Sequence, residues 1–337
     1  MISKKEKLSL VYFISNSFFL ASGYSIIFKL SGKDSWISMF IGMLIGSSLI
    51  YMFNKTCFNK NRNYILNEKI NKLKKTLISI FFIFIIFSNI LIVRIFATSF
   101  FLTKTPGLFI TIPFLFLAYL NSRKGIKTIS KISEILMPIS MFVILITIIT
   151  TLKDGSISSF LPVLSSSKKN ILLASFYFAI FTAMPQLLLF DIKIDEKEHV
   201  KYYIQSSLIS ILIGIGTIYV LGPYLIKIFR FPEYMVLKQI KLFNFIEKVE
   251  NLIGLIWFFN LFICSSISIY NLEKINKNKT YLIIIIILYI IEFVSNNYEY
   301  ATIIYKYLPI ILLILGIVFF ITIYSITRKI KKVAKAT

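Results

Sequence analysis

The sequence predicts an all-α protein that crosses a membrane about ten times, and three observations support this fold class. First, 57% of the 337 residues are hydrophobic and the mean hydropathy is +0.80, whereas an average soluble chain is about 45–50% apolar. Second, the apolar residues gather into ten runs, most of them long enough to cross a hydrocarbon core of about 30 Å. Third, most of the 38 Lys and Arg residues lie between alternate runs, as the positive-inside rule requires.

The ten predicted spans follow one another along a single transmembrane domain, residues 1–337. Their approximate bounds are 8–29, 35–54, 76–102, 107–121, 126–151, 171–190, 203–226, 252–271, 281–297 and 305–326. An even number of spans puts both termini on one side of the membrane. The Lys and Arg bias predicts that this side is the cytoplasm. The first span is long and has Lys at both ends, so we expect no cleavable signal peptide.

A polar loop at Leu152–Asn170 divides the spans into two sets of five. Its Ser-, Lys- and Asn-rich end has the composition of a turn. The two sets, 8–151 and 171–326, each contain an odd number of spans, so two similar halves would lie inverted in the bilayer. The sequence therefore predicts a five-plus-five inverted repeat, although the halves are not visibly alike.

The first span of each half contains a residue that interrupts a helix. The first span holds Gly23 within Ser22–Ser25, and the sixth holds Pro185 after Thr182. Lipid cannot satisfy free backbone groups, so a break lies inside protein or beside a watery cavity. Breaks at corresponding positions in two halves point to a transporter solute site. The alternative is that Gly and Pro only permit kinks or close helix packing.

The predicted solute site draws on both breaks. Free N–H groups at a half-helix start favour a carboxylate, and free carbonyl oxygens favour an ammonium group or cation. The predicted ligand-binding residues are Ser22, Gly23, Tyr24, Ser25, Phe178, Phe181 and Thr182. Such a site suits a small amino acid or similar zwitterion, and it would equally hold a neutral solute. With 33 Phe in the chain, packing is the simpler explanation for any single phenylalanine.

Arg94, Glu134 and Glu292 are three of the charged residues in the predicted spans. A membrane-embedded arginine costs about 3 kcal/mol or more at mid-helix, so Arg94 either has a partner in the bundle interior or snorkels to the outer interface. Glu134 near the cytoplasmic end of the fifth span either pairs with Lys131 or Lys127 or helps to gate an inner vestibule. For Glu292 we expect a solvated carboxylate at the outer rim.

The sequence argues against several classes of function. The net charge of +23 is explained by a belt facing membrane lipid headgroups, so we expect no nucleic-acid partner. Catalytic triads, paired-carboxylate clefts and phosphate-binding glycine loops are lacking, so neither an enzyme nor a cofactor is predicted. Cys57 and Cys264 lie far apart, and the single histidine, His199, falls in the predicted loop Asp191–Lys201. We therefore expect no disulfide framework and no metal site.

The external segment Lys227–Asn251 is predicted to contain an amphipathic helix. Its apolar residues recur at helical spacing among charged ones, and they are Leu242, Phe245, Ile246 and Val249. Such a pattern is typical of a helix lying in the membrane interface. It either caps the external mouth or docks another protein.

Several short motifs, taken in order, carry a family resemblance. They are Gly23-Tyr24-Ser25, Lys33-Asp34-Ser35-Trp36-Ile37 with Gly42 and Gly46, Arg94 with Thr105-Pro106, Lys124-Gly125 with Glu134 and Pro138, Phe160-Leu161-Pro162-Val163-Leu164, Leu221-Gly222-Pro223, and Glu247, Glu250 and Trp257. Together they resemble the spore germination permease family, the B subunit of bacterial germinant receptors, within the amino acid–polyamine–organocation transporter superfamily. Each motif is short, and their order and spacing make the resemblance specific.

The resemblance implies a small-molecule germinant, usually an amino acid, bound at the broken first and sixth helices. It also implies germinant receptor A and C subunits as partners, in the inner membrane of a bacterial spore or cell. Two departures stand out: residues 178–190 contain no acidic residue, which weakens the case for ion or proton coupling, and Ile26–Lys29 replaces a proline after the first break. We expect a germinant-sensing, transporter-like subunit. The alternatives are a secondary permease for amino acids or related solutes and a ligand-free structural subunit.

Overall fold

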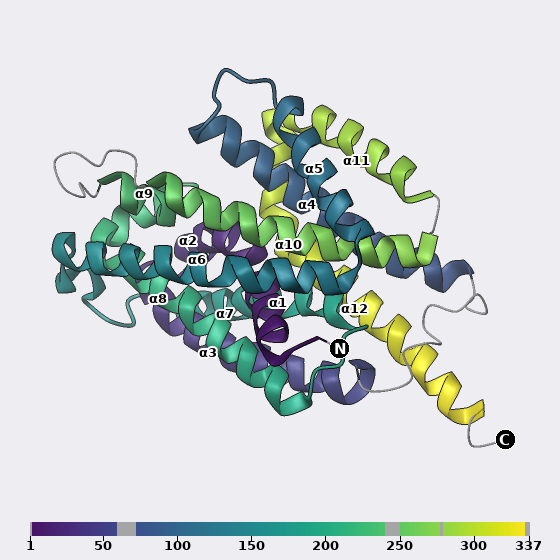
Figure 1. Cartoon of the computed structure of the whole chain (residues 1–337). Helices are drawn as coiled ribbons and strands as arrows, with labels where there is room; N and C mark the ends of the chain where they lie inside the picture. Colours follow the sequence, from purple (N-terminus) through teal and green to yellow (C-terminus); the bar gives the residue numbers. More distant parts are fainter. Residues whose placement is uncertain (1, 59–71, 240–249, 277–278, 334–337) are drawn as a thin grey trace.

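The computed structural model describes residues 2–58, 72–239, 250–276 and 279–333, and within these ranges the chain is helical with no strand (Figure 1). The α-helices are α1 Lys4–Ser17, α2 Tyr24–Ser31, α3 Ser35–Phe53, α4 Lys72–Phe100, α5 Leu108–Arg123, α6 Ile126–Asp154, α7 Lys168–Ala183, α8 Glu196–Ile228, α9 Pro232–Gln239, α10 Glu250–Asn276, α11 Thr280–Ser295 and α12 Tyr298–Val333. Shorter turns are the π-helices Phe19–Gly23 and Asn54–Phe58 and the 3-10 helices Gly32–Asp34, Ile157–Phe160 and Met184–Leu189.

Every predicted span coincides with a helix or a pair of helices. Seven segments of the described chain are long and apolar enough to cross a membrane. They are Tyr24–Thr56, Lys72–Phe100, Ile126–Ile149, Lys168–Leu189, Glu196–Ile228, Gly254–Asn276 and Thr302–Arg328. The apolar helices α5 and α11 have 16 residues each and are shorter. The chain is therefore an all-α polytopic membrane protein, while the count of ten spans and the inverted repeat stay predictions.

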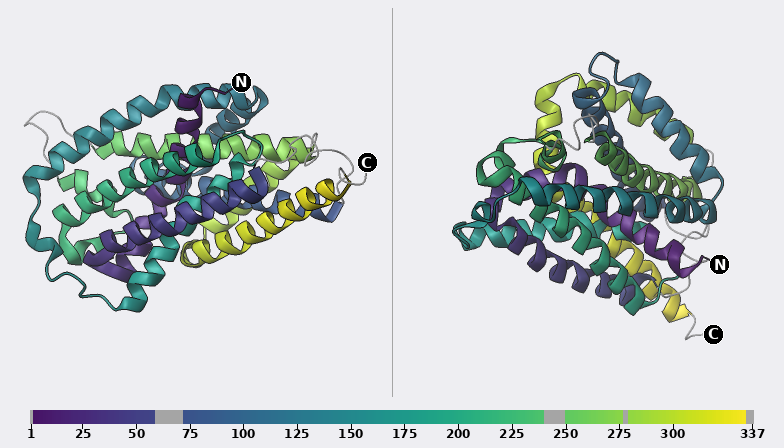
Figure 2. Two further views of the ribbon diagram at one scale, coloured as in Figure 1. Left: turned by 90° about the horizontal axis from the view of Figure 1, so that it is seen from below. Right: turned by 60° about the vertical axis from the view of Figure 1, so that its left-hand side comes forward.

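Helices from both predicted halves pack against one another throughout the bundle. Figures 1 and 2 show α6, α8 and α10 running side by side along its long axis. Helix α3 packs on α7 and α8, and α10 packs on α4 and α5. The short helix α1 lies among α6, α8 and α10, and its residues from Ser9 to Ser17 are all buried. The first and second halves thus share one core.

The break in the first helix is a π-helical turn rather than an unwound stretch. Phe19–Gly23 form the π turn, and Gly23 itself has helical backbone angles, φ −65° and ψ −43°. A π turn inserts one extra residue and shifts the hydrogen-bond pattern from i→i−4 to i→i−5. The Ser22 hydroxyl donates to the Phe18 carbonyl at 2.7 Å. The break therefore starts one turn before the predicted Ser22–Ser25.

The sixth predicted span changes its helical type where the proline predicts it. Helix α7 ends at Ala183, and Met184–Leu189 continue as a 3-10 helix with Pro185 in its first turn. Proline has no N–H to donate and fits the first turn of a helix. All six residues of the 3-10 helix are buried, so this change of geometry lies inside the protein, as the sequence predicted.

Polar contacts secure the two ends of the bundle. At the end that holds the N-terminus, which we call the terminal face, Lys4 pairs with Glu198 at 2.8 Å and Lys274 pairs with Asp191. At the other end, the opposite face, the buried Asp34 carboxylate accepts hydrogen bonds from the backbone N–H groups of Leu164 and Ser166 at 2.7 and 2.8 Å. Asp34 thus fixes the loop between the predicted halves to the turn between α2 and α3.

One sequence expectation about His199 is wrong. The residue does not lie in a charged loop, because α8 begins at Glu196 and the His199 ring is fully buried inside the bundle. The helix follows Asp195, which occupies the N-cap position with extended backbone angles. The predicted amphipathic helix at residues 242–249 and the Cys57 side chain lie outside the described residues.

Candidate solute site

The first break packs through aromatic rings against α7, the helix that leads into the sixth break. The Phe19 ring in the π turn lies 4.7 Å from the Phe178 ring of α7 in an edge-to-face arrangement, and 4.4 Å from the Tyr24 ring. All three rings are buried. Edge-to-face pairs add roughly 0.5–1.5 kcal/mol beyond area burial. Phe19 was missed in the sequence, because one phenylalanine among 33 carries no signal of its own.

Gly23 is needed for this aromatic contact. A Cβ atom at Gly23 would lie 2.3 Å from the Phe19 ring, closer than real Cβ contacts allow. The glycine therefore makes room for the ring rather than relaxing the backbone, since its φ is helical. This is a packing role inside the break.

The remaining predicted aromatic and hydroxyl residues form a buried polar and apolar cluster. The Tyr24 hydroxyl donates to the Ser210 carbonyl of α8. Thr182 donates to the Phe178 carbonyl at 2.8 Å, and its Oγ1 lies 2.7 Å from the Tyr203 hydroxyl. Phe181 is fully buried. These side chains anchor α2 and α7 to α8.

A cavity of about 660 Å³ opens beside the first break. It is lined by Ser22, Ser25, Ile26, Lys29, Leu30, Tyr177, Ile228, Arg230, Thr302, Tyr305, Lys306, Tyr307 and Ile310. Small-molecule sites are typically about 300–1,000 Å³, so this volume suits a small solute. Two of the seven predicted ligand-binding residues, Ser22 and Ser25, line it; the other five form the packed cluster behind it.

The lining of this cavity combines apolar walls with positive charge. Lys29 comes from α2, Arg230 from the connection between α8 and α9, and Lys306 from α12. The Arg230 guanidinium carbon lies 4.4 Å from the centre of the Tyr305 ring, a cation–π contact that orients it. This arrangement could not be predicted from the sequence, because the three cations are far apart along the chain.

Behind the breaks, a chain of buried polar side chains joins α1 to the sixth break. Gln186 of the 3-10 helix donates to the Ser15 hydroxyl at 2.7 Å and to the Val11 carbonyl at 3.0 Å. Its carbonyl oxygen lies 3.2 Å from Nε2 of His199, whose Nδ1 lies 3.1 Å from Oδ1 of Asn54. The position of Gln186 directly after Pro185 could have indicated a functional residue. The sequence analysis considered this stretch only for the presence of an acidic residue.

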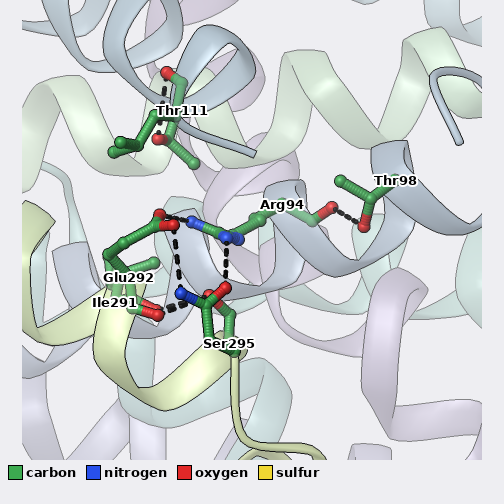
Figure 3. A network of polar contacts seen from close by, with 8 residues as sticks. Arg94, Thr98, Thr111, Ile291, Glu292 and Ser295 are labelled. Carbon is green, nitrogen blue, oxygen red and sulfur yellow. Dashed lines mark hydrogen bonds and ion pairs between the residues drawn. The ribbon is translucent and has the colours of Figure 1, made fainter. Parts of the chain in front are cut away.

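Arg94 has an ion-pair partner in the bundle. Its guanidinium pairs with the Glu292 carboxylate of α11 and donates to the Asn296 side chain at 3.2 Å (Figure 3). The Arg94 side chain is 8% exposed and that of Glu292 is 31% exposed. A Cβ atom at Gly107 would lie 2.4 Å from the guanidinium, so the start of α5 covers the pair. The structure gives Arg94 a partner in the bundle interior, and that partner, Glu292, is a partly exposed carboxylate.

Glu134 lies away from the cavity on α6. It is half-buried and follows Ser133, whose hydroxyl is 2.7 Å from that of Ser9 on α1. In the described part of the chain its carboxylate makes no ion pair within 4 Å, so neither Lys127 nor Lys131 holds it. Arg94 and Glu134 are thus outside the cavity lining.

Glu233 of α9 is a buried acid that sequence reasoning missed. It is 3% exposed and faces a small void that Leu20 of the π turn and Trp257 also line. Among the described residues its Oε2 atom has no hydrogen-bond partner. Burial raises the pKa of the Glu233 carboxyl well above its ordinary value, because a low-dielectric surrounding disfavours the charged form.

Comparison with known proteins agrees with the fold. Residues 3–301 match a family described as "Spore germination protein". The Bacillus subtilis (strain 168) protein named "Putative spore germination protein YfkT" is 24% identical over 237 residues, 67% of this chain and 65% of that protein. Two crystal structures of mutants of the Eremococcus coleocola manganese transporter each superpose with a TM-score of 0.50 and 14% identity, covering 96% of this chain and 75% of theirs. At that identity, the two structures establish a shared fold.

Proposed function

The chain belongs to the spore germination permease family, and from this premise we propose that it is a germinant-sensing, transporter-like subunit of a spore germination receptor. The observation that carries the proposal is the cavity of about 660 Å³ beside the break in the first helix. Ser22 and Ser25 line it, and the Phe19–Phe178 contact behind it connects the π turn to α7, the helix that leads into the sixth break. A ligand in this cavity touches the π turn at Ser22 and α7 at Tyr177.

The proposed mechanism is a shift between two arrangements of the bundle. A ligand shifts such an equilibrium only by its difference in affinity for the two states. In the described state the cavity is open, and the rings of Phe19, Tyr24 and Phe178 behind it are packed together. A small molecule, in our proposal an amino acid, would favour one packing of α2 against α7 over the other.

Germinant receptor A and C subunits are the proposed readers of this shift. We place the protein in the bacterial inner membrane, of spore or cell, with both termini in the cytoplasm, because most Lys and Arg residues then lie on that side. The cavity lies near the opposite face, formed by the end of α2 and the start of α12. In this orientation it opens to the exterior, where a germinant arrives.

Binding to the purified full-length protein tests the proposal. We expect an amino acid, within a panel of amino acids, nucleosides and sugars, to raise the melting temperature once its concentration passes its dissociation constant. Ser25→Leu should fill the cavity and abolish the shift, while Ser48→Leu on the exposed face of α3 should leave it unchanged. Ligand-induced shifts that survive Ser25→Leu would place binding elsewhere and overturn the proposed site.

A secondary permease is the second candidate, favoured by the fold shared with a metal-ion transporter. Proteoliposomes containing the protein alone separate the two functions. Saturable, gradient-driven uptake of the bound solute without partner subunits supports the permease. Binding without uptake, together with a germination response lost in Ser25→Leu spores of normal protein level, supports the sensor.

A further inference from the structure

The cavity beside the first break has an unbalanced charge. Three of its thirteen lining residues are cationic, namely Lys29, Arg230 and Lys306, and none of the thirteen is acidic. Polar or charged groups that converge on a mostly apolar pocket usually determine which solute it accepts. A cavity with this lining disfavours a cation, because like charges would meet there.

The three cations are not neutralised by neighbouring carboxylates. Within the residues that the structure describes, the ion pairs involve Lys4, Arg94, Arg123 and Lys274, and none of the three cavity cations is within 4 Å of an acidic oxygen. Cations that lie around a concave, low-dielectric surface add their fields and concentrate anions there. Their positive charge is therefore available to a ligand.

Two of the three cations lie near aromatic rings of the cavity lining. Arg230 is half-buried and lies over the Tyr305 ring at 4.4 Å, and the Lys306 ammonium lies 5.6 Å from the centre of the Tyr307 ring. A guanidinium group can bind an oxyanion through two parallel N–H groups. Ser22 and Ser25 add hydroxyl groups to the lining.

We propose that this cavity binds the carboxylate or phosphate group of a small organic anion, with Arg230 as its main contact and Lys29 and Lys306 as supporting charges. The inference rests on the proposed function and specifies its ligand class. It excludes cationic solutes and leaves neutral ones as weak binders. The anionic group can belong to a soluble solute or to a lipid headgroup that enters between α2 and α12.

Thermal unfolding of the full-length protein in nanodiscs distinguishes these cases. In phosphatidylcholine discs we expect glutamate to raise the melting temperature, and glutamine, lysine and glucose to do so weakly or not at all. Added salt should weaken the effect of glutamate, since exposed charges are screened over about 8–10 Å at 0.10–0.15 M. A second set of discs containing phosphatidylglycerol tests the lipid source.

Substitutions assign the effect to the cavity. Arg230→Gln should weaken glutamate binding about tenfold or more, because a charge-assisted contact is lost; Arg230→Lys should keep the preference for anions with reduced affinity. Lys104→Gln, which removes an exposed cation outside the cavity lining, should change nothing. A preference for anions in the Arg230→Lys protein shows that a change at this position does not simply prevent folding.

The outcomes separate this inference from the proposed function. Stabilisation by phosphatidylglycerol that needs Arg230 and competes with glutamate supports the anion site and identifies its occupant as a headgroup. A different outcome is binding of a neutral or cationic solute that Ser25→Leu abolishes and Arg230→Gln does not change. That result overturns the anion inference alone. If the melting-temperature shifts caused by every probe are unaffected by both Ser25→Leu and Arg230→Gln, the proposed function is overturned together with the anion inference.

Discussion

The side-chain carbonyl of Gln186 lies 3.2 Å from Nε2 of His199, and this contact joins the sixth break to α8. Both ring nitrogens of His199 face carbonyl oxygens, because the amide nitrogens of Gln186 and Asn54 donate to backbone carbonyls and so fix both amides. A neutral imidazole has one N–H to donate. One of the two contacts therefore lacks a shared hydrogen when the ring is neutral.

Replacing Gln186 tests how strongly this polar chain holds α1 to the sixth break. Gln186→Leu leaves Ser15 and the Val11 carbonyl without their donor, and we expect a loss of about 2–3 kcal/mol in unfolding free energy. The measurement is denaturant unfolding in mild detergent. Gln205→Leu, at an exposed position of α8, is the matched control and should have little effect. Equal stability of the two variants would contradict the linkage.

Gly23 and Phe19 provide a test of packing inside the π turn. Gly23→Ala places a Cβ atom against the Phe19 ring, and overpacking of this kind costs about 1–3 kcal/mol. The expected results are a lower melting temperature and a weaker response to ligand. Phe19→Leu in the same chain makes room for the new methyl group.

The double variant Gly23→Ala/Phe19→Leu should therefore be more stable than the sum of the two single changes predicts. Melting temperatures of the four proteins in one detergent supply the comparison. If the two changes simply add, the ring is not what excludes a side chain at residue 23.

Arg94 and Glu292 should be energetically coupled. Arg94→Ala and Glu292→Gln each remove one partner of a charge-assisted contact, and we expect a coupling energy of about 1–3 kcal/mol from a double-mutant cycle. The partial exposure of Glu292 puts the value toward the lower end. Arg123 and Glu273 at the terminal face, with a 4.0 Å separation and an exposed arginine, form the control pair and should show coupling near zero.

Glu233 should make the packing of α9 against the bundle dependent on pH. Because burial raises the pKa of its carboxyl above the ordinary 4.5, the folded state holds the proton more tightly than the unfolded chain does. The protonated Glu233 carboxyl therefore contributes to the free energy of unfolding. This contribution is complete below pH 4.5 and declines as the pH rises through the raised pKa of Glu233 in the folded protein. Raising the pH should therefore loosen α9, and not the reverse.

Trp257 lines the same void as Glu233 and can report this change. The chain has two tryptophans, so Trp36→Phe leaves Trp257 as the only tryptophan, which can be excited selectively over tyrosine. We expect its emission to shift to longer wavelength as the pH rises, and Glu233→Gln to flatten that dependence. A titration that persists in the Glu233→Gln protein would assign the pH effect to another group.

Local features of the fold were predictable because they depend on nearby residues. Apolar runs marked every long helix, since a membrane-spanning helix needs about 20 apolar residues in succession. Pro185 marked the change from α7 to the 3-10 helix, because the missing N–H acts within one turn. The first break was predicted a turn too late: a π turn needs no special residue, so Gly23 signalled the break without locating its start.

Contacts between distant residues were not predictable from the sequence. Arg94 and Glu292 are 198 positions apart, and Gln186 meets Ser15 across 171. The sequence by itself determined the helical membrane fold and which two spans are interrupted, because hydropathy and backbone chemistry act over a few residues. Only the tertiary structure decided that Lys29, Arg230 and Lys306 share one cavity and that His199 is buried, because those neighbours are set by how the helices pack.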